Sequence, residues 1–134
     1  MRKVILASHG DMAKGAGMSL EMILGEQENL RTYGLYPGEN PADYAAQLEE
    51  EIRREPETRF VIVTDLAGAS VCNAMFPLSR YENVQVFTGF NLQFLLELVS
   101  GEEAMTPEET EELLGSARQG VRQVTFEMEE EEDF

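Results

Sequence analysis

The sequence predicts an α/β fold: a doubly wound, mainly parallel sheet with helices on both faces. Apolar runs typical of strands alternate along the chain with segments of helical periodicity. The runs at 4–7 and 60–63 contain no polar residue, as is typical of strands buried on both faces of a parallel sheet. A length of 134 residues, of which 43% are hydrophobic, suits one domain with a sizeable core. We expect the common strand order 2-1-3-4, in which ligands bind at the carboxyl ends of strands 1 and 3.

The first half of the chain predicts two strand-helix units. In order, these are a strand ending at His9, a helix over 11–24, a strand over 30–35 and a helix from Pro41 to about Arg54. Gly25 is placed to end the first helix, and Asn40 followed by a proline is a typical helix start. Pro56 prevents the second helix from continuing, because a proline restricts the backbone of the residue before it.

The second half continues the alternation. It predicts a strand over 60–65, a helix from Val71, a strand over 84–88, a helix between Asn91 and Gly101 and a helix from Pro107 to about Gln119. We expect Ser70 to cap the helix at Val71 and Pro77 to shorten it. Thr106 and Glu109 have the spacing of a capping box.

The C-terminal segment predicts an edge strand followed by a tail. Val124, Phe126 and Met128 alternate with polar residues, as in a half-exposed strand. We therefore expect a single domain over residues 1–128 that ends in an edge strand at 121–128. Residues 129–134 are an acidic run, which we expect to be a solvated tail.

The composition excludes several classes of function. A net charge of −16 disfavours nucleic acid and anionic membranes as partners, and it favours a basic protein partner. One cysteine cannot form an internal disulfide, and one cysteine with one histidine cannot supply a structural zinc site. No apolar run is long enough to cross a bilayer, and the N-terminal run is too short for a signal peptide. We therefore expect a cytoplasmic protein that needs neither a metal nor a cofactor.

The only histidine of the chain, His9, lies where the first strand ends. Asp65 ends the third strand, so the expected order places both side chains on adjacent strands about 5 Å apart. A carboxylate that accepts one imidazole N–H leaves the other ring nitrogen with an outward lone pair, as a nucleophile requires. Attack on a phosphoryl group would form phosphohistidine, and the helix starts after Gly10 and Ser70 could offer N–H groups to its oxygens. Plainer roles stay open: an ordinary core or surface position for His9, and helix caps for Asp65 and Ser70.

Two motifs resemble a family of bacterial transport proteins. The segments 8–15 and 65–74, and also 88–92, are similar to the IIA components of the mannose/fructose/sorbose class of the sugar phosphotransferase system (PTS). The resemblance covers roughly residues 2 to 120. It implies that His9 accepts a phosphoryl group from the histidine-containing phosphocarrier protein and passes it to a IIB component, for sugar uptake and phosphorylation. It also implies that Asp65 orients the imidazole, and that the protein is a homodimer in which the C-terminal strand can exchange between subunits.

The second motif departs from the family at the turn that faces the phosphoryl group. The family usually has Gly-Gly-Ser-Pro there, whereas this chain has Gly68-Ala69-Ser70-Val71. The turn is therefore less flexible and the helix start less restricted. The departure removes none of the expected chemical groups, so Gly68 and Ser70 remain candidates beside the phosphoryl group.

Other functions fit parts of the pattern. A receiver-like binding module would be phosphorylated on Asp65, but it needs an acidic pair at the end of strand 1, where Ala7 and Ser8 stand. The phosphocarrier subunit of a dihydroxyacetone kinase uses a comparable histidine, although the motif at 65–74 fits the sugar-transport class better. A regulatory protein could keep the fold and the histidine and only bind partners.

Overall fold

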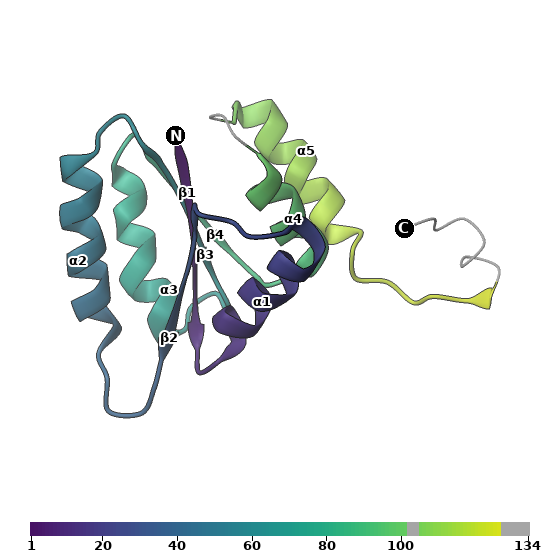
Figure 1. Cartoon of the computed structure of the whole chain (residues 1–134), viewed down its shortest axis with the longest axis horizontal. Coiled ribbons are helices and arrows are strands. Elements are labelled where there is room, and N and C mark those ends of the chain that lie inside the picture. The colour runs from purple at the N-terminus through teal and green to yellow at the C-terminus, as the bar shows by residue number, and fades with distance from the viewer. Residues whose placement is uncertain (102–104, 127–134) are drawn as a thin grey trace.

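The structure is a computed structural model that describes residues 1–101 and 105–126. Within these residues, four parallel strands form one sheet in the order β2-β1-β3-β4, which confirms the predicted order (Figure 1). The strands are β1 (Arg2–His9), β2 (Leu30–Leu35), β3 (Arg59–Thr64) and β4 (Val84–Thr88). The helices are α1 (Met12–Leu24), α2 (Pro41–Arg54), α3 (Ser70–Met75), the 3-10 helix η1 (Phe76–Arg80), α4 (Leu92–Ser100) and α5 (Pro107–Arg118).

Helices cover both faces of the sheet, with α2 and α3 on one side and α1, α4 and α5 on the other (Figure 1). Successive residues of a strand point to opposite faces, so each strand contributes to two separate cores. In β1, Ile5 and Ala7 pack in the core beneath α2 and α3, whereas Leu6 packs in the core beneath α1 and α4. The same alternation directs Ser8 toward α1 and His9 toward α3, which decides what each of them contacts.

Side-chain caps start three of the helices as the sequence predicts. Asn40 Oδ1 accepts a hydrogen bond from the N–H of Ala42 at the start of α2. Asn91 Oδ1 accepts one from the N–H of Phe94 in α4. Thr106 and Glu109 form a complete capping box at α5. These local bonds satisfy N–H groups that a helix leaves unpaired, so they set where each helix begins.

The prediction that Ser70 caps α3 is wrong. Ala69 occupies the N-cap position, and Ser70 is the first residue of the helix. Its hydroxyl makes no cap hydrogen bond and lies beside His9 instead. The helix ends at Met75, and η1 follows with Pro77 in its first turn, as expected from a proline that cannot continue an α-helix.

The predicted C-terminal edge strand is not found at residues 121–126, which contain no strand. The physical reason is position: after α5 the chain leaves the body, so this segment lies beside neither β2 nor β4, the edge strands (Figure 1). Val121, Val124 and Phe126 are consequently exposed, at 81%, 51% and 81%. The last two residues of the predicted strand, 127 and 128, and the acidic tail at 129–134 lie outside the described residues.

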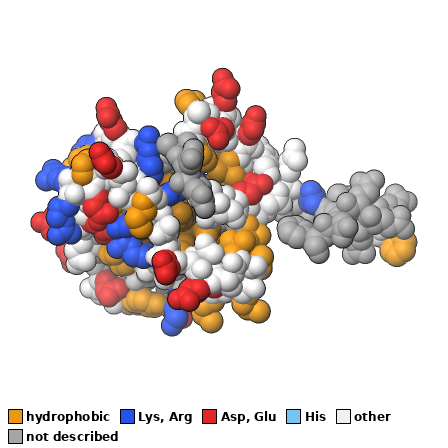
Figure 2. Space-filling model, turned by 45° about the horizontal axis from the view of Figure 1, so that its top comes forward, with side chains coloured by type: hydrophobic (Ala, Val, Ile, Leu, Met, Phe, Trp, Pro, Cys, Tyr) orange, Lys and Arg blue, Asp and Glu red, His pale blue; other side chains and the backbone are white. Residues whose placement is uncertain are grey.

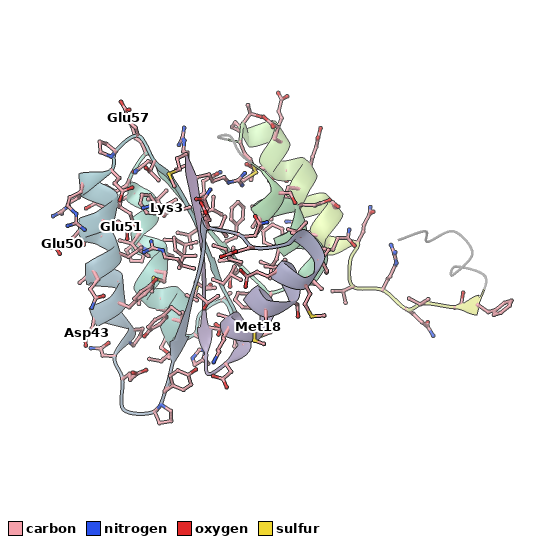
Figure 3. The ribbon with its side chains drawn as sticks, viewed as in Figure 1. Lys3, Met18, Asp43, Glu50, Glu51 and Glu57 are labelled. Carbon is pink, nitrogen blue, oxygen red and sulfur yellow. The ribbon has the colours of Figure 1, made fainter. Side chains whose placement is uncertain are left out.

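Ion pairs join α2 to the sheet. Lys3 Nζ lies 2.8 Å from Glu51 Oε2 and 2.9 Å from Glu55 Oε1, and Figure 3 shows Lys3 and Glu51 between β1 and α2. Arg31 Nη1 lies 3.0 Å from Glu51 Oε1. Acidic and basic side chains are intermixed on this side of the molecule (Figure 2). In the part of the chain that is described, no helix combines the length and the apolar character needed to span a membrane.

Candidate active site

His9 and Asp65 lie side by side at the carboxyl ends of β1 and β3. His9 Nδ1 is 2.8 Å from Asp65 Oδ2, and the backbone N–H of His9 donates to the same oxygen at 2.9 Å. Parallel pairing brings them together, because Ala7 is opposite Thr64, the residue before Asp65. An ionised Asp65 can only accept, so this contact assigns the ring proton to Nδ1 and leaves the lone pair on Nε2.

The imidazole is open to solvent, whereas its carboxylate partner is enclosed. The His9 side chain is 47% exposed and that of Asp65 is 10% exposed. Burial by itself would raise the pKa of Asp65, but the hydrogen bonds from the backbone and ring of His9 outweigh it. The pKa of Asp65 therefore lies below its ordinary value of 3.8. Asp65 stays ionised at neutral pH and holds the ring, while Nε2 remains accessible.

Ser70 stands beside the free nitrogen of His9. Its Oγ lies 3.3 Å from His9 Nε2, within reach of a hydrogen bond. The loop before α3 turns at Gly68, whose φ of +79° favours glycine. The side chain of Asn73 donates to the Gly68 carbonyl at 3.0 Å. Asn73 therefore ties this loop to α3 and helps to hold Ser70 next to His9, a role that no pattern in the sequence indicated.

Gly10 turns the chain away immediately after His9, with a φ of +57°. Its N–H donates to the Leu35 carbonyl at 2.8 Å, so it is already engaged and is not free for a ligand. The Gly10 carbonyl lies over Gly34, where an added Cβ would come within 2.4 Å of the oxygen. Gly34 therefore provides the room in which the tip of β1 folds over β2.

Ser8 has a structural role that the sequence analysis did not assign. It is fully buried, and its Oγ accepts a hydrogen bond from the N–H of Ala13 at 2.7 Å. Ser8 thus fastens the first turn of α1 to the strand that carries His9. A serine near the end of a strand, a few residues before a helix start, is the signal that could have indicated this contact.

The site is an open tip of the sheet. A cavity of about 550 Å³ lies at the opposite end, where Met1, Val4, Asn29 and Leu30 at the starts of β1 and β2 contribute to its walls. Among residues 1–101 and 105–126, no three His, Cys, Asp or Glu side chains are grouped so that they could hold a metal ion. An exposed imidazole at such a tip suits a reacting group that another macromolecule presents.

The family model described as PTS system fructose IIA component matches residues 3–114 of the chain. The chain belongs to this family. The sorbose-specific EIIA component from Klebsiella pneumoniae is 32% identical over 110 residues, which are 81% of this chain and 81% of that protein. The mannose-specific EIIAB component from Escherichia coli K12 is 29% identical over 96 residues, which are 70% of this chain but 30% of that protein.

A solved structure supports the same assignment. The PTS IIA protein associated with the fucose utilization operon of Streptococcus pneumoniae has a TM-score of 0.75 and 32% identity, and the match covers 91% of this chain and 92% of that one. This protein is therefore a IIA component of the mannose/fructose/sorbose class of the sugar phosphotransferase system. The resemblance stated from the segments 8–15 and 65–74 is confirmed at the level of the family.

Proposed function

We propose that this IIA component carries a phosphoryl group on Nε2 of His9. It accepts the group from the histidine-containing phosphocarrier protein and passes it to a IIB component, for sugar uptake and phosphorylation. The observation that carries the proposal is the contact of His9 Nδ1 with Asp65, which leaves the lone pair on Nε2, beside Ser70, in a side chain that is 47% exposed. Membership of the IIA family supports the same chemistry.

The transfer step uses the His9 imidazole as the nucleophile. The lone pair of Nε2 forms a bond to the phosphorus of the donor phosphohistidine, the nitrogen–phosphorus bond of the donor breaks, and its electron pair returns to the donor ring. His9 keeps its proton on Nδ1 throughout. The ring gains positive charge as the bond forms, and the Asp65 carboxylate stabilises that charge through the hydrogen bond from Nδ1. In the transfer to the IIB component, a nucleophile of that protein attacks the phosphorus. The bond between phosphorus and His9 Nε2 then breaks, and its electron pair returns to the His9 ring.

The second motif supports the bound phosphoryl group. The Ser70 hydroxyl lies close to Nε2, so it donates to a phosphoryl oxygen once the nitrogen is occupied. Gly68 shapes the loop that carries Ser70. Gly10 acts through the turn after His9, because its N–H is paired with Leu35. No metal or cofactor has a part in the proposed step, and we expect the protein to carry it out in the cytoplasm.

The test is phosphorylation by purified components. Phosphoenolpyruvate, the first enzyme of the system and the phosphocarrier protein should label the chain with a phosphate that is lost in acid and kept in alkali, as expected of phosphohistidine. The His9→Ala variant should take up none. A label that is lost in alkali or with hydroxylamine would be an acyl phosphate on Asp65 and would contradict the proposal. Chase of the label into a IIB protein tests the second transfer.

We also propose that the protein is a homodimer of domains spanning residues 1–128, joined through the C-terminal segment. β4 is at the edge of the sheet, and Val124 and Phe126 are exposed on a segment that leaves the body (Figure 1). An edge strand has unpaired backbone groups that a strand from a second chain can bind. Light scattering should give twice the mass of the chain, and Phe126→Glu should shift the equilibrium to monomer. A monomeric wild type at micromolar concentration would contradict this arrangement.

A further inference from the structure

Asp11 and Tyr36 form a hydrogen-bonded pair near His9 that the proposed transfer step does not use. The Tyr36 hydroxyl donates to Asp11 Oδ1. Asp11 is the N-cap residue of α1, and Tyr36 follows the last residue of β2. The pair therefore bridges two chain segments that flank the tip of β1, and both side chains are exposed.

The position of Asp11 makes this pairing unusual. An aspartate at an N-cap ordinarily accepts a hydrogen bond from the N–H of the second or third helical residue. In α1, the second residue, Ala13, donates its N–H to Ser8, and Asp11 makes no side-chain cap hydrogen bond. Ser8 thus takes the usual role of the N-cap side chain, and the Asp11 carboxylate is directed to Tyr36.

We propose that Tyr36 is a positioning residue that holds the Asp11 carboxylate away from the phosphoryl group on His9. This inference rests on the proposed function. Asp11 follows His9 by two residues, so their Cα atoms lie at most about 7.6 Å apart. That separation is within the screening length of about 8 Å at physiological salt. A carboxylate free to rotate there would repel an incoming phosphoryl group, and the Tyr36 hydroxyl prevents that rotation.

The surroundings of Tyr36 hold its hydroxyl in place. Its backbone N–H donates to Glu39 Oε1 at 2.8 Å. Its ring folds back against Gly34, where an added Cβ would lie 3.1 Å from the hydroxyl oxygen. The hydrogen bond to Asp11 is the main reason that the pKa of Tyr36 lies above its ordinary value of 10.0. The hydroxyl therefore keeps its proton and remains a donor.

The test labels His9 chemically, without partner proteins. Potassium phosphoramidate phosphorylates exposed histidines, and this chain has one histidine. Initial labelling rates are measured by phosphorus NMR for the wild type, Tyr36→Phe, Asp11→Ala and the double variant. We expect Tyr36→Phe to slow labelling about two- to fivefold. The Asp11 carboxylate can then approach the reacting nitrogen, where its negative charge repels the negatively charged phosphoryl group. The double variant should label as fast as Asp11→Ala alone, because no carboxylate is left to misplace.

Tyr33→Phe is the matched control, because Tyr33 is a tyrosine of β2, three residues before Tyr36, and its ring stacks on Tyr44. It should label at the wild-type rate, and thermal unfolding verifies that every variant is folded. A labelling rate of Tyr36→Phe equal to that of the wild type would overturn the proposal. So would slow labelling that Asp11→Ala does not relieve, which would indicate a distorted turn. If phosphoramidate labels the wild-type chain but the phosphocarrier protein does not, the proposed function alone is contradicted. If phosphoramidate does not label the wild-type chain, both the proposed function and the role of Tyr36 are overturned.

Discussion

One oxygen of Asp65, Oδ2, accepts hydrogen bonds from both the backbone N–H and the ring Nδ1 of His9. The same atom therefore holds the end of β1 and the orientation of the imidazole. The other oxygen, Oδ1, is buried and has no hydrogen-bond partner among the described residues. The interaction of this carboxylate with His9 is consequently concentrated on one atom, and its loss should affect the position and the tautomer of the ring together.

Asp65→Asn should slow phosphorylation of His9 by about two to four orders of magnitude. The backbone N–H of His9 keeps the amide oxygen at the position of Oδ2, so the amide orients the ring only as a neutral acceptor, which is weaker than the carboxylate. An amide also lacks the charge that stabilises the developing imidazolium. Rapid-quench measurement of the label gives the rate, and titration with the phosphocarrier protein should show unchanged affinity. A rate within threefold of the wild type would exclude Asp65 from the mechanism.

Ser70→Ala should slow phosphorylation about tenfold to a hundredfold, the usual effect of losing one hydrogen-bond donor to a charged group. Ser79→Ala is the matched control, because the Ser79 hydroxyl donates to the Phe76 carbonyl in η1 and does not contact His9. We expect its rate to equal that of the wild type. Equal rates for the two variants would mean that the contact between Ser70 and Nε2 has no part in the transfer.

Gly34→Ala should destabilise the fold by about 1–3 kcal/mol, because its Cβ would approach the Gly10 carbonyl to 2.4 Å and force the backbone to shift. Gly15→Ala is the contrasting substitution, since a Cβ there meets no atom within 4 Å. It should stabilise α1 by about 0.5–1 kcal/mol, as alanine is the better helix former. Urea unfolding measures both, and a stable Gly34→Ala variant would show that the tip of β1 is not closely packed on β2.

Stability should fall in acid partly through Glu51. Burial would raise the pKa of Glu51, but hydrogen bonds from Lys3 and Arg31 outweigh it and hold the pKa below its ordinary value of 4.5. Because the folded-state pKa is the lower one, the unfolded chain binds the proton more readily, and the stabilisation is complete above about pH 4.5. It is lost as the pH falls through the folded-state pKa.

Glu51→Gln should therefore flatten the dependence of the unfolding free energy on pH between about 5 and 3, relative to the wild type. Glu57→Gln serves as the control, because Glu57 is exposed and forms no ion pair within the described residues. Its curve should run parallel to that of the wild type. Urea titrations at several pH values measure the slopes, and a Glu51→Gln slope equal to the wild-type slope would contradict the role of this ion-pair network.

Short-range patterns were sufficient for most of the fold. The apolar runs that became β1 and β3, the caps at Asn40 and Asn91 and the capping box at Thr106 all depend on residues within one turn or one strand. The alternation of strands and helices indicated parallel strands joined by right-handed crossovers, and the strand order was predicted as the common one for such sheets. The meeting of His9 and Asp65 follows from that order.

Contacts between distant segments were needed for the rest. Ser70 is a residue type that commonly caps helices, yet the fold places the ring of His9, at the end of β1, beside its hydroxyl. The segment at 121–126 has the alternation of a strand but lies beside no edge of the sheet. A hydroxyl or a strand edge bonds to whichever group the fold brings within about 3 Å, and the identity of that group is not encoded in its sequence neighbours.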